Sequence, residues 1–318
     1  MRNRIQVFLE ARDGAGLVRL ADSCAAELED PASAYRAVGR FVAALAAAAD
    51  QADSREWSVL RRALSLHPLA GKLRRDPLVA QAWRAGSAAP ETTLGDLMLR
   101  HPEAERLVRA ADRVGRNIYA ATSALPGPEA VRDRRRLIAR VADSIAEQRP
   151  GAEILAIAPG HMREAEATLA GPSGGIRRWV GLVSEPEEAT EIARSLPLPW
   201  VLPIRRSPLA TLLRPDLLGQ FDFAYCKSLE IMADAVAESL LVAAFARLRP
   251  GGRLLVACRS PGAPDAAFWA LAGESVPYPR DEAMLARLSG ALDPREIAAR
   301  RAFGGINEAI AYLEVVKA

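Results

Sequence analysis

The sequence contains little cysteine and little histidine. Its 318 residues include only three cysteines, Cys24, Cys226 and Cys258, and three histidines. The wide spacing of the cysteines fits neither a disulfide framework nor a zinc site, and His-Glu-x-x-His is absent. We therefore expect a protein of a reducing compartment with no metal site.

Long apolar runs and a strong excess of one charge are also missing. The longest alanine-rich run, residues 41–49, is far shorter than the roughly 20 residues that cross a membrane. The first ten residues lack the apolar segment of a signal peptide. The formal net charge of +3 is small and dispersed, and it does not indicate nucleic acid. We expect a soluble, cytoplasmic protein with neither a membrane nor a nucleic acid as partner.

Several common catalytic motifs are absent. The chain has no Gly-x-Ser-x-Gly and no Walker-type sequence, and no Gly-x-Gly-x-x-Gly follows its first predicted strand. The glycine-rich residues 171–175 precede a predicted strand, whereas a phosphate-binding loop must lead into a helix. A nicotinamide or flavin dinucleotide is therefore not expected.

The first half of the chain has helical periodicity. Apolar spacing and Pro-containing starts predict helices over residues 35–45, 57–66, 77–83, 94–125 and 128–148, with a loop at 85–93. The basic run 132–136 is predicted to be the solvated face of the last helix, and an anion-binding role is the alternative. The breaker sequence at 149–151 predicts a domain boundary, with a helical domain at 1–150 and a second domain at 151–318.

The second half alternates between strand and helix patterns. Strands are predicted at residues 154–158, 179–183, 200–204, 221–226 and 253–258, and helices at 163–170, 186–195, 208–218 and 234–248. This alternation predicts an α/β fold with a parallel, Rossmann-like sheet. Residues 296–303 and 309–316 flank Gly304-Gly305-Ile306-Asn307 and predict a final hairpin, whose last strand runs antiparallel to its neighbour.

Three segments carry a resemblance to a known family. They are Leu-Arg-Pro-Gly-Gly-Arg-Leu-Leu-Val at 248–256, Phe-Asp-Phe-Ala-Tyr at 221–225, and Ala-Pro-Gly-His-Met-Arg-Glu-Ala-Glu at 158–166. The chain thereby resembles the class I S-adenosylmethionine-dependent methyltransferases. Within them it is similar to a bacterial subgroup that has an Ala-Cys-Gly-His-x-Arg-Glu first motif and a helical N-terminal region.

The resemblance implies a sheet of six parallel strands plus one antiparallel strand, and a helical N-terminal domain that covers it and supplies the acceptor pocket. It implies S-adenosylmethionine as cofactor and methyl transfer to a small-molecule acceptor, most simply O-methylation of a hydroxyl or a carboxylate. The alternative is a methyltransferase-fold protein that has lost methyl transfer and serves as a binding or assembly partner, or catalyses another reaction. A homodimer and a monomer both stay open.

The same resemblance places the cofactor site at the carboxyl ends of the strands. The implied residues are Ala158, Pro159, Gly160, His161, Arg163, Val183, Ser184, Glu185, Arg206, Ser207, Tyr225, Cys226 and Lys227. Two family acids are replaced, by Ala156 in the first motif and by Val183 at the ribose position. A carboxylate suits the ribose because its two oxygens match two vicinal hydroxyl donors. Glu185 is a candidate replacement, and a residue that caps the following helix is the alternative.

Two residues are candidates for the chemistry. His161 at the tip of the first turn could donate a hydrogen bond or act as a base near neutral pH, and a turn residue that bonds the backbone is the alternative. Glu230 and Lys227 are the only charges at the end of the fourth strand, so one of them could take the proton of an acceptor. A surface ion pair is the alternative there, and Cys226 is expected to be a core residue.

Overall fold

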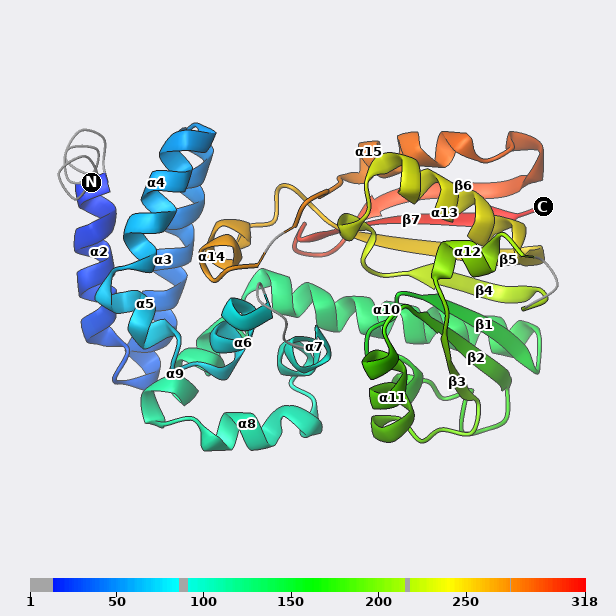
Figure 1. Ribbon diagram of the computed structural model, residues 1–318, viewed down its shortest axis with the longest axis horizontal. Helices are drawn as coiled ribbons and strands as arrows, with labels where there is room; N and C mark the ends of the chain where they lie inside the picture. The colour runs from blue at the N-terminus through cyan, green and yellow to red at the C-terminus, as the bar shows by residue number, and fades with distance from the viewer. Residues whose placement is uncertain (1–13, 86–90, 215–217, 275) are drawn as a thin grey trace. The chain divides into compact units, whose positions relative to one another are not determined.

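The computed structural model describes residues 14–85, 91–214, 218–274 and 276–318. The chain forms two compact units, Met1–Glu129 with Pro264–Ser275, and Ala130–Ala263 with Val276–Ala318 (Figure 1). The predicted boundary near residue 150 lies inside the second unit, after the end of its long helix α10 (Pro126–Gln148). No helix in the described ranges is long and apolar enough to cross a membrane.

In its described residues the first unit consists of helices joined by short turns, without a strand. Its helices are α2 (Gly14–Glu27), α3 (Pro31–Gln51), α4 (Ser54–Ser65), α5 (Pro68–Leu73), α6 (Pro77–Ala85), α7 (Glu91–Leu99), the 3₁₀ turn η1 (Pro102–Ala104), α8 (Glu105–Ala110), α9 (Arg113–Thr122) and α14 (Ala266–Leu271). Side-chain caps fix several starts: Asp30 accepts from the Ser33 N–H, and Asp53 forms a capping box with Glu56. The loop predicted at 85–93 is wrong for residue 85, which ends α6, and for residues 91–93, which begin α7; residues 86–90 lie outside the described residues.

The second unit is built on a seven-stranded sheet in the order β3-β2-β1-β4-β5-β7-β6. The strands are β1 (Ala152–Ile157), β2 (Ile176–Val183), β3 (Val201–Arg205), β4 (Phe221–Cys226), β5 (Leu248–Arg259), β6 (Ile297–Gly304) and β7 (Ile310–Lys317). β7 runs antiparallel to both β5 and β6, and the other six strands share one direction. This topology confirms the predicted fold class and the predicted final hairpin.

Helices cover both faces of the sheet. Successive strand residues point to opposite faces, and the strands are apolar on both, so both faces must be buried. In β1, Ile154 and Ala156 pack with residues of α10 and of α11 (Pro186–Ser195), whereas Leu155 and Ile157 belong to the other core cluster. That second cluster includes residues of α12 (Pro208–Leu212), α13 (Asp234–Ala246) and α15 (Glu282–Leu288). The near-continuous apolar sequence of β1 therefore reflects burial on both faces.

Two predicted helices of the second unit differ from the structure. The helix expected at 163–170 is wrong, because the segment contains only the 3₁₀ turn η2 (Ala165–Ala167). Arg163 and Glu164 at its start are buried and held by polar partners, so tertiary contacts override the local helical pattern. The helix expected at 208–218 is shorter than predicted, since α12 ends at Leu212, and residues 215–217 lie outside the described residues.

Candidate functional site

The carboxyl ends of β1, β2 and β4 meet at one edge of the sheet. Ile157 at the end of β1 is in register with Leu182 of β2 and with Cys226 of β4. The strand order reverses between β1 and β4, and open α/β sheets bind ligands at such a switch point. The loops after these three strands are therefore the place to look for a site.

The loop after β1 turns tightly and folds back over β2. Ala158, Gly160 and Met162 have positive φ angles of 46°, 56° and 52°. Met162 is fully buried, and a Cβ on Gly181 of β2 would lie 2.5 Å from the Met162 Sδ atom. Gly181 is thus required by the close approach of Met162, and the loop does not lead into a helix N-terminus.

A buried ion pair joins this loop to the end of β4. The Glu164 carboxylate, 2% exposed, accepts hydrogen bonds from Lys227 Nζ at 2.9 and 3.1 Å and from the Tyr225 hydroxyl at 2.5 Å. The Tyr225 oxygen also accepts a bond from Trp179 Nε1 at 3.2 Å. One buried polar network therefore joins the loop after β1, the end of β4 and the middle of β2.

The same network sets the charge of its two ions. Burial alone would raise the pKa of Glu164, but the Lys227 ammonium and the hydrogen bonds outweigh it and hold that pKa below its ordinary value. Burial lowers the pKa of Lys227, and the Glu164 charge opposes that shift. Glu164 is an ionised anchor for the loops, and sequence reasoning missed this role because the two residues lie 63 positions apart.

Two arginines of α10 bind the same loops. Arg134 donates to the Lys227 carbonyl at 2.5 Å, and Arg135 Nε donates to the Arg163 carbonyl at 2.8 Å. Arg163 is 1% exposed and donates to Glu166 at 2.9 Å and to the Ser195 carbonyl at 3.1 Å. The prediction that residues 132–136 form a solvated helix face is wrong for Arg134 and Arg135, which are half-buried.

The residues implied for ribose binding differ in their accessibility. The Val183 side chain is fully buried in the core cluster that contains residues of α10 and α11. Ser184 and Glu185, which follow it, are exposed. Glu185 is the N-cap residue of α11, yet its side chain makes no cap hydrogen bond. Its carboxylate therefore lies at the end of β2 without the capping role that was the alternative.

The remaining implied residues divide into exposed and buried groups. Arg206 and Ser207 after β3 are exposed, and Ala158, Gly160 and Lys227 are partly exposed. Pro159 and Cys226 are buried. Burial raises the pKa of the Cys226 thiol to about 11, which keeps it protonated at neutral pH and excludes a thiolate nucleophile there.

The two catalytic candidates occupy different environments. His161, in the loop after β1, is buried. Glu230 lies in the 3₁₀ turn η4 (Leu229–Ile231) after β4, and its side chain accepts a bond from the Arg259 N–H at 3.3 Å. Burial raises the pKa of Glu230, which suits this carboxylate to accept a proton.

A further arginine fixes the segment that carries Glu230. Arg280 is fully buried and donates to the carbonyls of Leu229 at 2.9 Å and Met232 at 2.6 Å. It also forms an ion pair with Asp234 at 2.7 Å. The segment after β4 is thus clamped by a side chain from residues that follow β5, which no local pattern could reveal.

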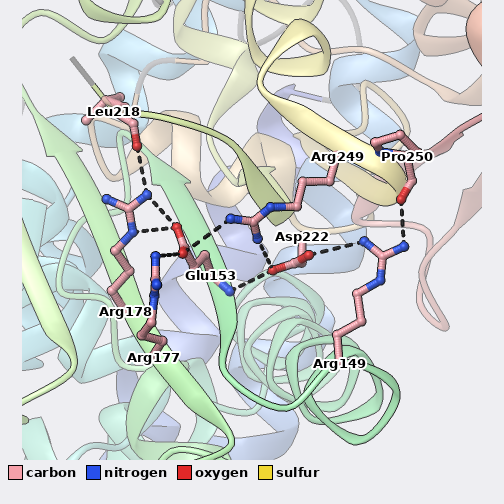
Figure 2. Close-up of polar contacts among 8 residues, drawn as sticks. All are labelled: Arg149, Glu153, Arg177, Arg178, Leu218, Asp222, Arg249 and Pro250. Carbon is pink, nitrogen blue, oxygen red and sulfur yellow. Dashed lines mark hydrogen bonds and ion pairs between the residues drawn. The ribbon is translucent and has the colours of Figure 1, made fainter. Parts of the chain in front are cut away.

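A second charged cluster lies at the opposite, amino edge of the strands (Figure 2). Glu153 near the start of β1 is 2% exposed and is surrounded by guanidinium groups from β2 and β5. Arg178 Nε donates to it at 2.6 Å, Arg249 lies 3.3 Å away, and Arg177 also pairs with it. These contacts tie the starts of three strands together.

Asp222 near the start of β4 completes this cluster. Its carboxylate accepts the Glu153 N–H at 2.9 Å, Arg249 at 2.6 Å and Arg149 at 3.2 Å (Figure 2). The acid that matches the family's fourth-strand motif therefore serves to join strands at the edge away from the switch point. In the described part of the chain, no group of three or more His, Cys, Asp or Glu side chains is placed to hold a metal ion.

Comparisons with known proteins support the fold. No family model matches the sequence, and no curated protein shows significant similarity to it. The structure is similar to that of a Bordetella parapertussis protein described as a possible exported protein, at 17% identity and a TM-score of 0.53, over 78% of this chain and 96% of that one. At this identity the likeness concerns the fold alone.

Two further solved structures match this one with lower TM-scores. One is the N-methyltransferase NodS from Bradyrhizobium japonicum in complex with S-adenosyl-L-homocysteine, with 13% identity, a TM-score of 0.42 and coverage of 72% of this chain and 99% of that one. The other is magnesium protoporphyrin IX methyltransferase from Synechocystis with bound S-adenosylmethionine, with 14% identity, a TM-score of 0.40 and coverage of 60% and 83%. Similarity at these scores carries no inference about function.

Proposed function

We propose that the protein is an S-adenosylmethionine-dependent methyltransferase that acts on a small-molecule acceptor. The observation that carries this proposal is the strand order β3-β2-β1-β4-β5-β7-β6 with β7 alone antiparallel. This is the sheet that the resemblance of residues 158–166, 221–225 and 248–256 implies. The proposed cofactor site is the edge at the carboxyl ends of β1, β2 and β4.

The residues at this edge offer groups that fit the cofactor. The exposed Glu185 carboxylate at the end of β2 would bind the two ribose hydroxyls, since it is not used as a helix cap. At Gly160, the nearest atom to an added Cβ would be Lys227 Cε at 4.0 Å, so a ligand can approach the backbone there. The bound cofactor would supply an electrophilic methyl group.

The chain's own contribution would be alignment, exclusion of water and the handling of one proton. The Glu164–Lys227 pair and Arg134 hold the loops after β1 and β4 in one arrangement, which serves alignment. Glu230, whose pKa is raised by burial, would accept the proton of an acceptor hydroxyl. A carboxylate acceptor is already ionised at neutral pH and would need no base.

Calorimetric titration of S-adenosylmethionine and S-adenosylhomocysteine tests the proposal. Glu185→Ala is expected to weaken binding of both by about 10- to 150-fold, because a charge-assisted hydrogen bond contributes about 1.5–3 kcal/mol. Glu187→Ala is the matched control, since Glu187 is also exposed and lies in the first turn of α11. Equal affinities for the wild type and Glu185→Ala would contradict the assignment of Glu185.

A second candidate is a methyltransferase-fold protein that has lost methyl transfer. The packing of Met162 against Gly181 and the burial of Val183 at the ribose position favour it, because both fill the edge with apolar atoms. Under this alternative neither nucleoside binds the folded wild-type protein at millimolar concentration. Saturable binding of either nucleoside that Glu185→Ala weakens would contradict the loss of the cofactor site.

A further inference from the structure

The helical first unit has a pocket of its own, of about 360 Å³. One face of α4 forms its first wall, with Ser58, Arg61, Arg62 and Ser65 at the i, i+3, i+4, i+7 spacing. Trp83 of α6 and residues at the end of α14 form the rest. This volume is within the range of about 300–1,000 Å³ that is typical of small-molecule sites.

The pocket is positively charged. Arg61 and Arg62 are exposed, and no acidic side chain lines the pocket. Among the residues that the structure describes, neither arginine has an ion-pair partner. Two adjacent guanidinium groups without a carboxylate form a site to which an anion is attracted, and their planar forks match a carboxylate.

The remaining walls consist of an indole and small or aliphatic residues. Trp83 is half-buried, and the Arg74 guanidinium lies over its ring at 3.7 Å from the centroid. Ala270 and Leu271 provide an apolar surface, and Gly273 has a φ of 93° that brings the backbone close to α6. A Cβ on Gly273 would lie 3.4 Å from the Trp83 Cα atom. Arg74 thus covers one face of the indole, and the indole with Leu271 gives the pocket an apolar surface against which an aromatic ring can pack.

We propose that this pocket binds a small aromatic carboxylate, with the carboxylate at Arg61 and Arg62 and the ring system against Trp83 and Leu271. The charge of the arginine pair selects the anion, and the apolar walls select the ring. The pocket lies wholly within residues of the first unit, and it does not depend on the methyl transfer proposed for the sheet edge.

The test is titration of 2-naphthoate into the full-length protein by calorimetry. Saturable binding is expected, and Arg61→Gln with Arg62→Gln in one variant should weaken it by about 3- to 30-fold, as two solvent-exposed charge contacts are lost. Arg55→Gln is the matched control, because Arg55 is an exposed arginine of α4 that does not line the pocket. The control should bind like the wild type.

Two further ligands separate the parts of the proposal. The neutral 2-naphthalenemethanol should bind more weakly than 2-naphthoate, and inorganic phosphate should bind more weakly than either if the ring supplies affinity. The proposal is overturned by the absence of saturable 2-naphthoate binding in the millimolar range, by equal affinity for the alcohol, or by tighter binding of phosphate. An equal loss in the Arg55→Gln control would overturn it as well.

Discussion

Replacing Asp222 by alanine is expected to lower the free energy of unfolding of the second unit by about 3 kcal/mol. The Asp222 side chain is 5% exposed and accepts three hydrogen bonds, from the Glu153 N–H at 2.9 Å, Arg249 at 2.6 Å and Arg149 at 3.2 Å. Its removal leaves the buried Glu153 N–H without an acceptor and takes one acceptor from each guanidinium group. Arg249 keeps its contact with Glu153 and Arg149 keeps the Pro250 carbonyl, but the amino edge of the sheet loses its common partner.

The magnitude follows from the exposure of the partners. An unsatisfied buried N–H costs about 1–3 kcal/mol, and removal of one member of a fully buried ion pair costs about 3–5 kcal/mol. Arg149 and Arg249 are 44% and 33% exposed, so water replaces part of what they lose. The lower end of the ion-pair range is therefore expected. Asp222→Asn should cost less, because its amide oxygen can still accept the Glu153 N–H.

The change in unfolding free energy of the second unit is measured by urea unfolding, with hydrogen exchange of the β1 and β4 amides as the signal. Glu191→Ala is the control, because the Glu191–Arg194 pair has side chains that are 33% and 64% exposed and should contribute less than about 1 kcal/mol. If Asp222→Ala is no more destabilising than Glu191→Ala, the network at the amino edge does not stabilise the sheet as inferred.

Two further changes should also affect stability. Asp76 accepts a hydrogen bond from Thr122 at 2.6 Å and caps α6, and burial raises its pKa from 3.8 to about 7. Because the folded state holds this proton more tightly than the unfolded state, the contribution of Asp76 to the free energy of unfolding is fully present below pH 3.8 and is lost as pH rises to about 7. The wild type should lose at most about 4 kcal/mol of unfolding free energy between these pH values, and Asp76→Asn should not show this loss. Urea unfolding of both proteins across this pH range measures it, and parallel curves of unfolding free energy against pH would contradict the inference. Val183→Asp should destabilise the second unit by several kcal/mol, because the side chain is fully buried among apolar groups. Wild-type stability with tighter S-adenosylmethionine binding would show instead that position 183 reaches the ligand.

Local sequence patterns were sufficient for most of the strands and for the final hairpin. β4 spans residues 221–226 as predicted, and β6 and β7 form the predicted hairpin, with β6 ending at Gly304. Strand and turn preferences act over a few neighbouring residues, and the apolar runs of a doubly covered sheet are continuous enough to recognise. The resemblance of residues 158–166, 221–225 and 248–256 added the family, with its sheet of six parallel strands and one antiparallel strand.

Tertiary structure alone determined how charged residues are used. The segment after β1 has helix-forming composition, yet its Arg163 and Glu164 are drawn into the core by Ser195 and Lys227 and leave only one 3₁₀ turn. Asp222 joins strands at the amino edge of the sheet because it pairs there with Arg149 and Arg249, which both lie outside β4. A buried charge needs a partner of opposite sign or several hydrogen bonds, and which residue supplies them depends on the packing of distant elements. Sequence periodicity carries no information about that packing.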